Sequence, residues 1–199
     1  FAAGSAGDLL SRLVAERMQA TLGQSVVVEN RVGASGRLAI MAIKTRDYPS
    51  AQELALKILQ DDERSGLAWH ILAIAKEKVG EFATSMQAYE AALQLLADHG
   101  PVAGDLGRLA FRMNMPDLAA KFFAHYRIAR PDCAEGANNL ACALREMNQD
   151  ADAIEVLRAA ILADPSQPML WNTLGTILIE NGDLGTGASF LHQGHMVAS

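Results

Sequence analysis

The hydrophobic positions of this chain follow a pattern that returns every 34 residues. A leucine marks one position in all five copies of the period: Leu38, Leu72, Leu106, Leu140 and Leu174. The residue directly after each leucine is small: Ala39, Ala73, Gly107, Ala141 and Gly175. A second small residue stands thirteen positions after each leucine: Ala51, Ser85, Ala119, Ala153 and Gly187. A fixed period without insertions predicts stacked copies of one structural unit.

Each unit is expected to be a pair of helices. The leucine lies on the buried stripe of the first helix, and the small residues lie where the second helix crosses it, so a bulky replacement would cost roughly 1–3 kcal/mol. A large apolar residue follows on the second helix in four copies: Tyr89, Phe123, Leu157 and Leu191. Between the two helices a Gly or an Asn recurs: Gly80, Asn114, Asn148 and Gly182. Both residue types tolerate the left-handed conformation that ends a helix.

Proline marks the later boundaries between units. Pro131 and Pro165 stand where one helix must stop and the next can begin. Glu63 and Ala97 occupy the equivalent positions at the first two boundaries, so looser turns are expected there. The predicted array covers 36–199, with units at about 36–65, 66–99, 100–133, 134–167 and 168–199.

Short motifs within the period resemble the tetratricopeptide repeat family. The family pattern Trp-x-x-Leu-Gly is complete at Trp171, Leu174 and Gly175, and nearly complete at Trp69. Its later Ala, aromatic and Pro positions are met in the third unit by Ala119, Phe123 and Pro131. The resemblance implies an all-α fold, a right-handed superhelix of five helical hairpins, and a role as a protein-interaction scaffold that binds a peptide or protein segment.

In that family the first helices line an inner groove. The resemblance places ten candidate binding residues there: His70, Lys78, Arg108, Phe111, Arg112, Asn138, Asn139, Arg145, Asn172 and Thr176. The groove positions also include Ile71, Ile74, Asp105, Cys142, Thr173 and Ile179. Asparagine amides can pair with an extended peptide backbone, and arginines can bind a carboxylate through two hydrogen bonds. The alternative is that these are only solvated polar residues on helices.

One known groove chemistry is missing. Members of the family that bind chaperone tails hold two carboxylates with a Lys at the fifth and an Asn at the ninth place of one repeat, and no repeat here has both. Chaperone C-terminal tails are therefore not expected as ligands.

The first 35 residues follow a different pattern. A glycine-rich loop leads into an amphipathic helix at about 8–22, and Val26-Val27-Val28 predicts a short strand at 25–29. The stretches Leu22-Gly23-Gln24, Val26 to Arg31, and Gly33-Ala34 with Gly36 resemble the N-terminal part of Bug-type solute receptors of tripartite tricarboxylate transporters. In those receptors the loop equivalent to Ala3–Asp8 helps to hold a carboxylate ligand.

The receptor-like stretch covers only about 36 residues of a family roughly 300 long, and neither lobe of a receptor is complete. Solute binding is therefore not predicted, and a periplasmic receptor fragment stays as a further alternative. The two resemblances meet near Gly36 without a linker, which is more typical of a gene fusion, a frameshift or an assembly error than of a designed domain pair. The helix at 8–22 could instead pack on the first repeat as a cap.

Composition and charge narrow the function. Half of the residues are hydrophobic and the net charge is −6, with no basic run, so nucleic-acid binding is not expected as a main role. No apolar stretch approaches the roughly 18–20 residues that cross a bilayer, so no membrane partner is expected. Cys133 and Cys142 would lie about 13 Å apart along one helix, beyond disulfide reach. Two free thiols favour the cytoplasm; the receptor-like stretch, if it reflects the chain's origin, favours the periplasm.

Catalytic chemistry is not predicted. The sequence has no His-Glu-x-x-His motif, Walker loop or nucleophile elbow, and we expect no catalytic residue, cofactor or metal site. His192 and His195 are three apart on the last predicted helix and are expected to be a solvated surface pair. Two further expectations concern partners: pairing of two copies through an exposed flank at Phe190 and Leu191, and, as an alternative role, an accessory array of a larger enzyme such as a glycosyltransferase.

Overall fold

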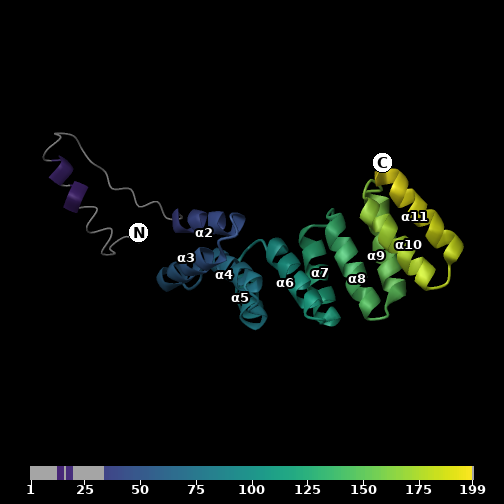
Figure 1. Cartoon of the computed structure of the whole chain (residues 1–199), viewed down its shortest axis with the longest axis horizontal. Coiled ribbons are helices and arrows are strands. Elements are labelled where there is room, and N and C mark those ends of the chain that lie inside the picture. The colour runs from purple at the N-terminus through teal and green to yellow at the C-terminus, as the bar shows by residue number, and fades with distance from the viewer. Residues whose placement is uncertain (1–12, 16, 20–33, 199) are drawn as a thin grey trace. The chain divides into compact units, whose positions relative to one another are not determined.

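A computed structural model describes residues 13–15, 17–19 and 34–198 of the chain, and within these residues it is helical with no strand (Figure 1). Residues 13–15 and 17–19 are helical, within the helix expected at 8–22; the strand expected at 25–29 lies outside the described residues. From residue 34 onward ten helices follow: α2 (Ala34–Lys44), α3 (Tyr48–Asp61), α4 (Gly66–Lys78), α5 (Phe82–Leu95), α6 (Gly100–Arg112), α7 (Pro116–Ala129), α8 (Ala134–Glu146), α9 (Asp150–Ala163), α10 (Pro168–Glu180) and α11 (Leu184–Ala198).

These helices form two compact units, and the chain passes from the N-terminal to the C-terminal unit between Glu81 and Phe82. In the N-terminal unit α2, α3 and α4 pack against one another. In the C-terminal unit each helix from α5 to α11 packs against the next, and α8 also contacts both α6 and α10. Within each unit this is the expected stacking of helices: α2 lies beside α4 in the N-terminal unit, and α8 lies beside both α6 and α10 in the C-terminal unit.

The turn inside each pair is the same in all five copies. The predicted residues have positive φ angles: Gly80 87°, Asn114 57°, Asn148 59° and Gly182 87°. Arg46, at the equivalent place of the first copy, also has a positive φ, of 61°, which the Gly and Asn pattern did not predict. In each copy the next residue donates its N–H to the carbonyl five positions back, as in Met115 to Ala110 at 3.0 Å and Asp47 to Ala42 at 2.8 Å. This bond closes the helix end and satisfies a carbonyl that would otherwise lack a partner.

The tryptophans of the family pattern hold the turns between units. Trp69 donates its indole N–H to the Glu63 carbonyl at 2.9 Å, and Trp171 donates to the Pro165 carbonyl at 2.8 Å. At the first boundary Ser65 N–H bonds to the Asp62 carbonyl at 3.1 Å, as Cys133 N–H does to the Arg130 carbonyl beside Pro131. The expectation of a looser turn at Glu63 is therefore wrong, because this bond forms without a proline.

Four of the five pattern leucines are buried, and one is not. Leu72, Leu106, Leu140 and Leu174 are at most 7% exposed, whereas Leu38 is 60% exposed. Leu174 shows the reason, since it packs into a core cluster with Leu157 and Ile161 of α9, the second helix of the preceding pair. No second helix of a preceding pair covers Leu38 among the described residues, so the expectation that it is buried is wrong.

The small residues let the helices of a pair touch. A Cβ atom added to Gly175 on α10 would lie 2.8 Å from the carbonyl oxygen of Gly187 on α11, and one added to Gly187 would lie 2.8 Å from the Gly175 carbonyl. At these distances the backbones of the two helices are in direct contact, which confirms the role predicted for both positions. Within the described part of the chain no helix is both long and apolar enough to cross a membrane.

Candidate peptide-binding site

The C-terminal unit has a small pocket between the first helices α6 and α8. The pocket is about 210 Å³ in volume, and six residues line it: Arg108, Phe111, Arg112, Phe123, Asn139 and Cys142. We call it the α6–α8 pocket. Four of these residues belong to the ten candidates taken from the family resemblance, and a fifth, Cys142, lies at another groove position. The structure therefore brings together one part of the predicted groove.

Phe123 of α7 was not predicted as a site residue, yet it contributes the base of this pocket. Its side chain is only 2% exposed, and its ring lies against Gly107 of α6. A Cβ atom at position 107 would lie 2.7 Å from the ring, so any residue larger than glycine would displace the ring. Two residues in the sequence indicate this contact. Gly107 stands where the first, second and fourth copies have Ala after the leucine, and the aromatic Phe123 follows it by sixteen positions.

Two of the candidate arginines, Arg108 at the pocket and Arg145 outside it, already have acidic neighbours. Arg108 forms an ion pair with Asp105 on its own helix and a second with Glu135 of α8 at 3.1 Å. Arg145 lies 3.7 Å from Glu180 of α10. An incoming carboxylate would have to displace these partners, so the two arginines are not open carboxylate sites in this arrangement.

Arg112 lies beside an aromatic ring. Its guanidinium lies 5.2 Å from the centre of the Phe82 ring, within the range of a cation–π interaction. Such a planar, weakly hydrated cation can stack on aromatic groups as well as bind anions. The rim of the pocket therefore suits apolar and aromatic groups.

The asparagines divide into different roles. Asn138 accepts a hydrogen bond from Thr173 of α10 at 2.6 Å and so links two successive pairs. Asn172 faces α11, where its oxygen would lie 2.3 Å from a Cβ atom at Gly194. The side-chain amide of Asn139 has no hydrogen-bond partner within the described chain, and Asn139 lines the α6–α8 pocket. Asn139 is thus the asparagine best placed to bond a ligand backbone.

The remaining candidates lie elsewhere. Thr176 donates its hydroxyl to the carbonyl of Asn172 one turn earlier on its own helix, at 2.9 Å. His70 and Lys78 are on α4 in the N-terminal unit, where His70 is half-buried and Lys78 is exposed with its ammonium 3.4 Å from Glu77. None of these three lines the α6–α8 pocket.

The two cysteines are free thiols in separate settings. Burial raises the pKa of Cys142, with Arg145 opposing the shift, so this thiol is held in its protonated and less reactive form. The Cys133 sulfur lies 3.3 Å from the Tyr126 hydroxyl. This contact, together with burial, raises the pKa of Tyr126 to about 12.

The last hairpin differs from expectation at its apolar residues. Phe190 is half-buried and stacks on Trp171 with ring centres 5.6 Å apart, and Leu191 is half-buried beside Gly175. These two residues are therefore less exposed than expected, because α10 packs against both, and pairing of two copies through this hairpin stays a prediction. His192 and His195 are exposed, and no cluster of three or more His, Cys, Asp or Glu side chains in the described chain could hold a metal.

Comparison with known proteins supports the repeat assignment. The tetratricopeptide repeat family matches residues 134–167, the fourth predicted unit. A crystal structure of MamA has a TM-score of 0.73 at 13% identity, covering 87% of this chain and 96% of that one. A MamA structure from Desulfovibrio magneticus RS-1 has a TM-score of 0.76 at 15% identity, covering 86% and 97%. YrrB, described as a TPR protein with an unusual peptide-binding site, has a TM-score of 0.72 at 14% identity, covering 82% and 84%.

Two relatives are similar in sequence. Protein FlbA of Caulobacter vibrioides is 59% identical over 191 residues, which is 96% of this chain and 32% of that protein. The chain thus spans about a third of FlbA, and because at most eight of the 199 residues lie outside the alignment, the join near Gly36 lies inside it. A UPF0065 protein of Bordetella bronchiseptica is 49% identical over 41 residues, 21% of this chain and 12% of that protein, which gives weak support to the receptor-like resemblance. The helical pairs of the described chain have the fold of tetratricopeptide-type hairpins, and residues 134–167 match the sequence pattern of that family.

Proposed function

We propose that this chain binds an extended segment of another protein across α6 and α8, with one apolar side chain of that segment in the α6–α8 pocket. The observation that carries the proposal is the pocket itself, in which the apolar side chains of Phe111, Phe123 and Cys142 and the unpaired side-chain amide of Asn139 share one lining. Its volume of about 210 Å³ is below the 300–1,000 Å³ typical of small-molecule sites and suits one large side chain. The peptide-binding site named for YrrB supports a peptide as the ligand class.

The ligand segment is expected to be apolar more than acidic. Arg108 is neutralised by Asp105 and Glu135, and Arg145 lies beside Glu180, so neither offers an uncompensated positive charge. Arg112 lies over Phe82 and adds a flat cation at the rim, which favours an aromatic ligand side chain. Asn139 would bond the ligand backbone next to that side chain, because an amide supplies both a donor and an acceptor.

A peptide array probed with the full chain tests this function. Bound peptides are expected to share one aromatic or large aliphatic residue whose replacement by alanine abolishes binding. Phe111→Ala and Asn139→Ala should each weaken binding about tenfold, the effect of losing roughly 1.4 kcal/mol at an interface hot spot. Lys121→Ala, an exposed change on α7, is the control and should leave binding unchanged. An array without bound peptides, or binding that neither pocket substitution alters, would contradict the proposal.

A second candidate function rests on the FlbA comparison. Since the aligned region is only 32% of FlbA, the repeats of that relative belong to a chain about three times as long as this one. We propose as the alternative that this array serves as the accessory part of a larger protein, such as an enzyme whose substrate it recruits. Sequencing the genomic locus and its transcript should then show an open reading frame that continues past the codon of Ser199. A stop codon directly after it would dismiss this alternative.

A further inference from the structure

The net charge of the chain lies in the unit that holds the α6–α8 pocket. From Phe82 onward the sequence has thirteen Asp and Glu residues against seven Lys and Arg residues, and the residues before Phe82 sum to zero. The surplus is also present among the candidate residues, since Arg145 of α8 lies 3.8 Å from Glu146 and 3.7 Å from Glu180. A surface with surplus negative charge attracts cationic segments and disfavours acidic ones.

The same surplus occurs directly beside the pocket. Arg108, which lines the pocket, pairs with Asp105 of its own helix and with Glu135 of α8. We call these three residues the Arg108 cluster. Because two carboxylates surround one guanidinium, the cluster keeps one negative charge.

Glu135 is the member of the Arg108 cluster that has room for a ligand charge. Its Oε1 accepts the hydrogen bond from Arg108, and its Oε2 has no partner within the described chain. The side chain of Glu135 is 51% exposed, against 21% for that of Asp105. An exposed carboxylate oxygen without a partner can accept a charge-assisted hydrogen bond from an incoming ammonium or guanidinium group.

The two ends of the pocket differ in charge. Arg112 lies in the last turn of α6, and Asp105 lies seven residues earlier, about 10 Å away along the helix axis. Glu135 lies in the first turn of α8. An extended segment advances about 3.3 Å per residue. A ligand residue one or two positions from the side chain in the pocket, which we call the anchor, can therefore reach the Arg108 cluster.

We propose that Glu135 is a specificity-determining residue that selects ligand segments with a Lys or Arg one or two positions from the apolar anchor. This inference rests on the proposed function and names the ligand class of that same pocket. The cation of the ligand binds Oε2 of Glu135, while the anchor fills the pocket and Asn139 bonds the ligand backbone. An acidic residue in the same place meets the surplus carboxylate and finds Arg108 already neutralised.

Two peptides that differ in one residue test the proposal on the full chain. Both carry the anchor sequence obtained from the peptide array, one with Lys and the other with Glu beside the anchor, and their Kd values are measured by fluorescence anisotropy at low ionic strength. The wild-type chain should bind the Lys peptide about three- to tenfold more tightly, the size expected for exposed charge contacts. This ratio of the two Kd values should fall toward one as salt is added.

Two substitutions should move the ratio in opposite directions. Glu135→Gln removes the charge that binds the Lys peptide and releases Arg108 to attract the Glu peptide, so the ratio should fall to about one or below. Arg108→Gln leaves both carboxylates of the cluster without their cation, so the ratio should rise at least about twofold. A defect in folding or in the shape of the pocket would weaken both peptides alike and leave the ratio unchanged.

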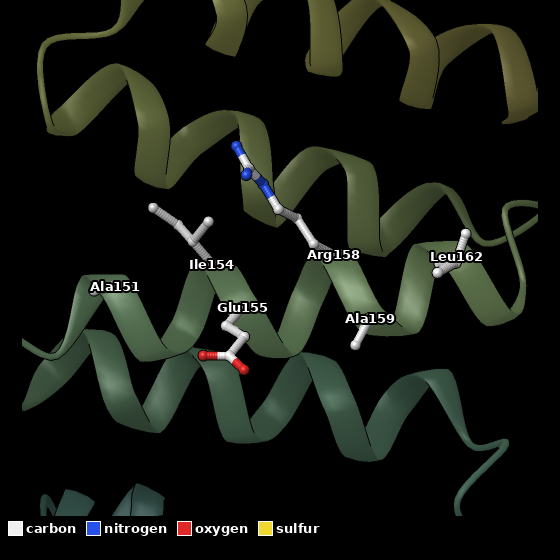
Figure 2. Close-up of a pocket in the computed structure, with 6 residues that line it drawn as sticks. All are labelled: Ala151, Ile154, Glu155, Arg158, Ala159 and Leu162. Carbon is white, nitrogen blue, oxygen red and sulfur yellow. The ribbon is translucent and has the colours of Figure 1, made fainter.

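Glu155→Gln is the matched control, because it removes the same charge from the same unit. Glu155 lies on α9, where it lines a different surface hollow with Ala151 and Ala159 (Figure 2). This variant should keep the wild-type ratio. A ratio that Glu135→Gln leaves unchanged, or that Glu155→Gln lowers equally, would overturn this inference while peptide binding itself stands. An array without bound peptides would overturn the proposed function and this inference with it.

Discussion

Phe123→Ala is expected to lower the free energy of unfolding by about 3–5 kcal/mol, the usual cost of removing a buried aromatic side chain. Phe123 is 2% exposed and belongs to a core cluster that joins α6, α7 and α8 through Ala110, Ala119 and Leu140. Its removal leaves a void at the junction of three helices that cannot close without moving one of them. Urea denaturation followed by far-UV circular dichroism gives the change in stability.

Two further variants make this prediction sharper. Ile128→Ala on the same helix removes a side chain that is 79% exposed and should change stability by less than about 0.5 kcal/mol. Gly107→Ala should destabilise the wild type, because its Cβ would lie 2.7 Å from the Phe123 ring. In the Phe123→Ala background the same methyl group enters the void, so the double variant should lose less stability than the two single losses added together. Additive losses would show that the ring does not occupy the space over Gly107.

Leu157→Ala is expected to cost about 2–5 kcal/mol, the usual range for truncating a buried leucine. Leu157 is fully buried on α9 and contacts a cluster that includes Leu170, Leu174 and Ile177 of α10. Because it belongs to one repeat and packs against the next, its loss should weaken the stacking of the two repeats as well as the helix pair itself. The midpoint of urea denaturation should fall accordingly.

The matched control for this leucine is Leu184→Ala. Leu184 is 65% exposed at the first position of α11, and its truncation should change stability by less than about 0.5 kcal/mol. Equal losses for Leu157→Ala and Leu184→Ala would contradict the packing described for α9 and α10. Both measurements use the full chain at one low protein concentration, so that self-association does not contribute.

The repeat could be predicted because one physical requirement recurs at each copy. Leu106 and Leu174 must fill the space beside a neighbouring helix, and Gly175 and Gly187 must let two backbones touch, so residue size alone revealed the register. Leu38 could not be placed in this way, since its burial depends on a helix of a preceding repeat and not on its own identity. Arg46 was missed for a related reason: a left-handed residue that is neither Gly nor Asn has no signature in the sequence, and the bond from Asp47 to Ala42 closes the turn there.

The candidate site was only partly predictable. Helical spacing and the family resemblance placed Arg108, Phe111 and Asn139 on one face, and the structure brings them together at one pocket. The sequence did not show that Arg108 forms an ion pair with Glu135, 27 residues away, because that contact depends on how closely α6 and α8 approach. The contribution of Phe123 depends in the same way on the crossing of α6 and α7 at Gly107.

The links between successive first helices differ in strength along the C-terminal unit. Besides the buried cluster that α6 and α8 share, the polar link between them is the ion pair of Arg108 with Glu135. The two side chains are 46% and 51% exposed, and such exposed pairs contribute only about 0–1 kcal/mol. Between α8 and α10 the half-buried hydrogen bond from Thr173 to Asn138 adds to the contact of Arg145 with Glu180. The polar link between α6 and α8 is therefore the weaker of the two, and the α6–α8 pocket lies beside it. A ligand side chain that enters the pocket and separates α6 from α8 would break this weaker link first. We therefore expect ligand binding to change the angle between α6 and α8 before it changes the packing of α8 on α10.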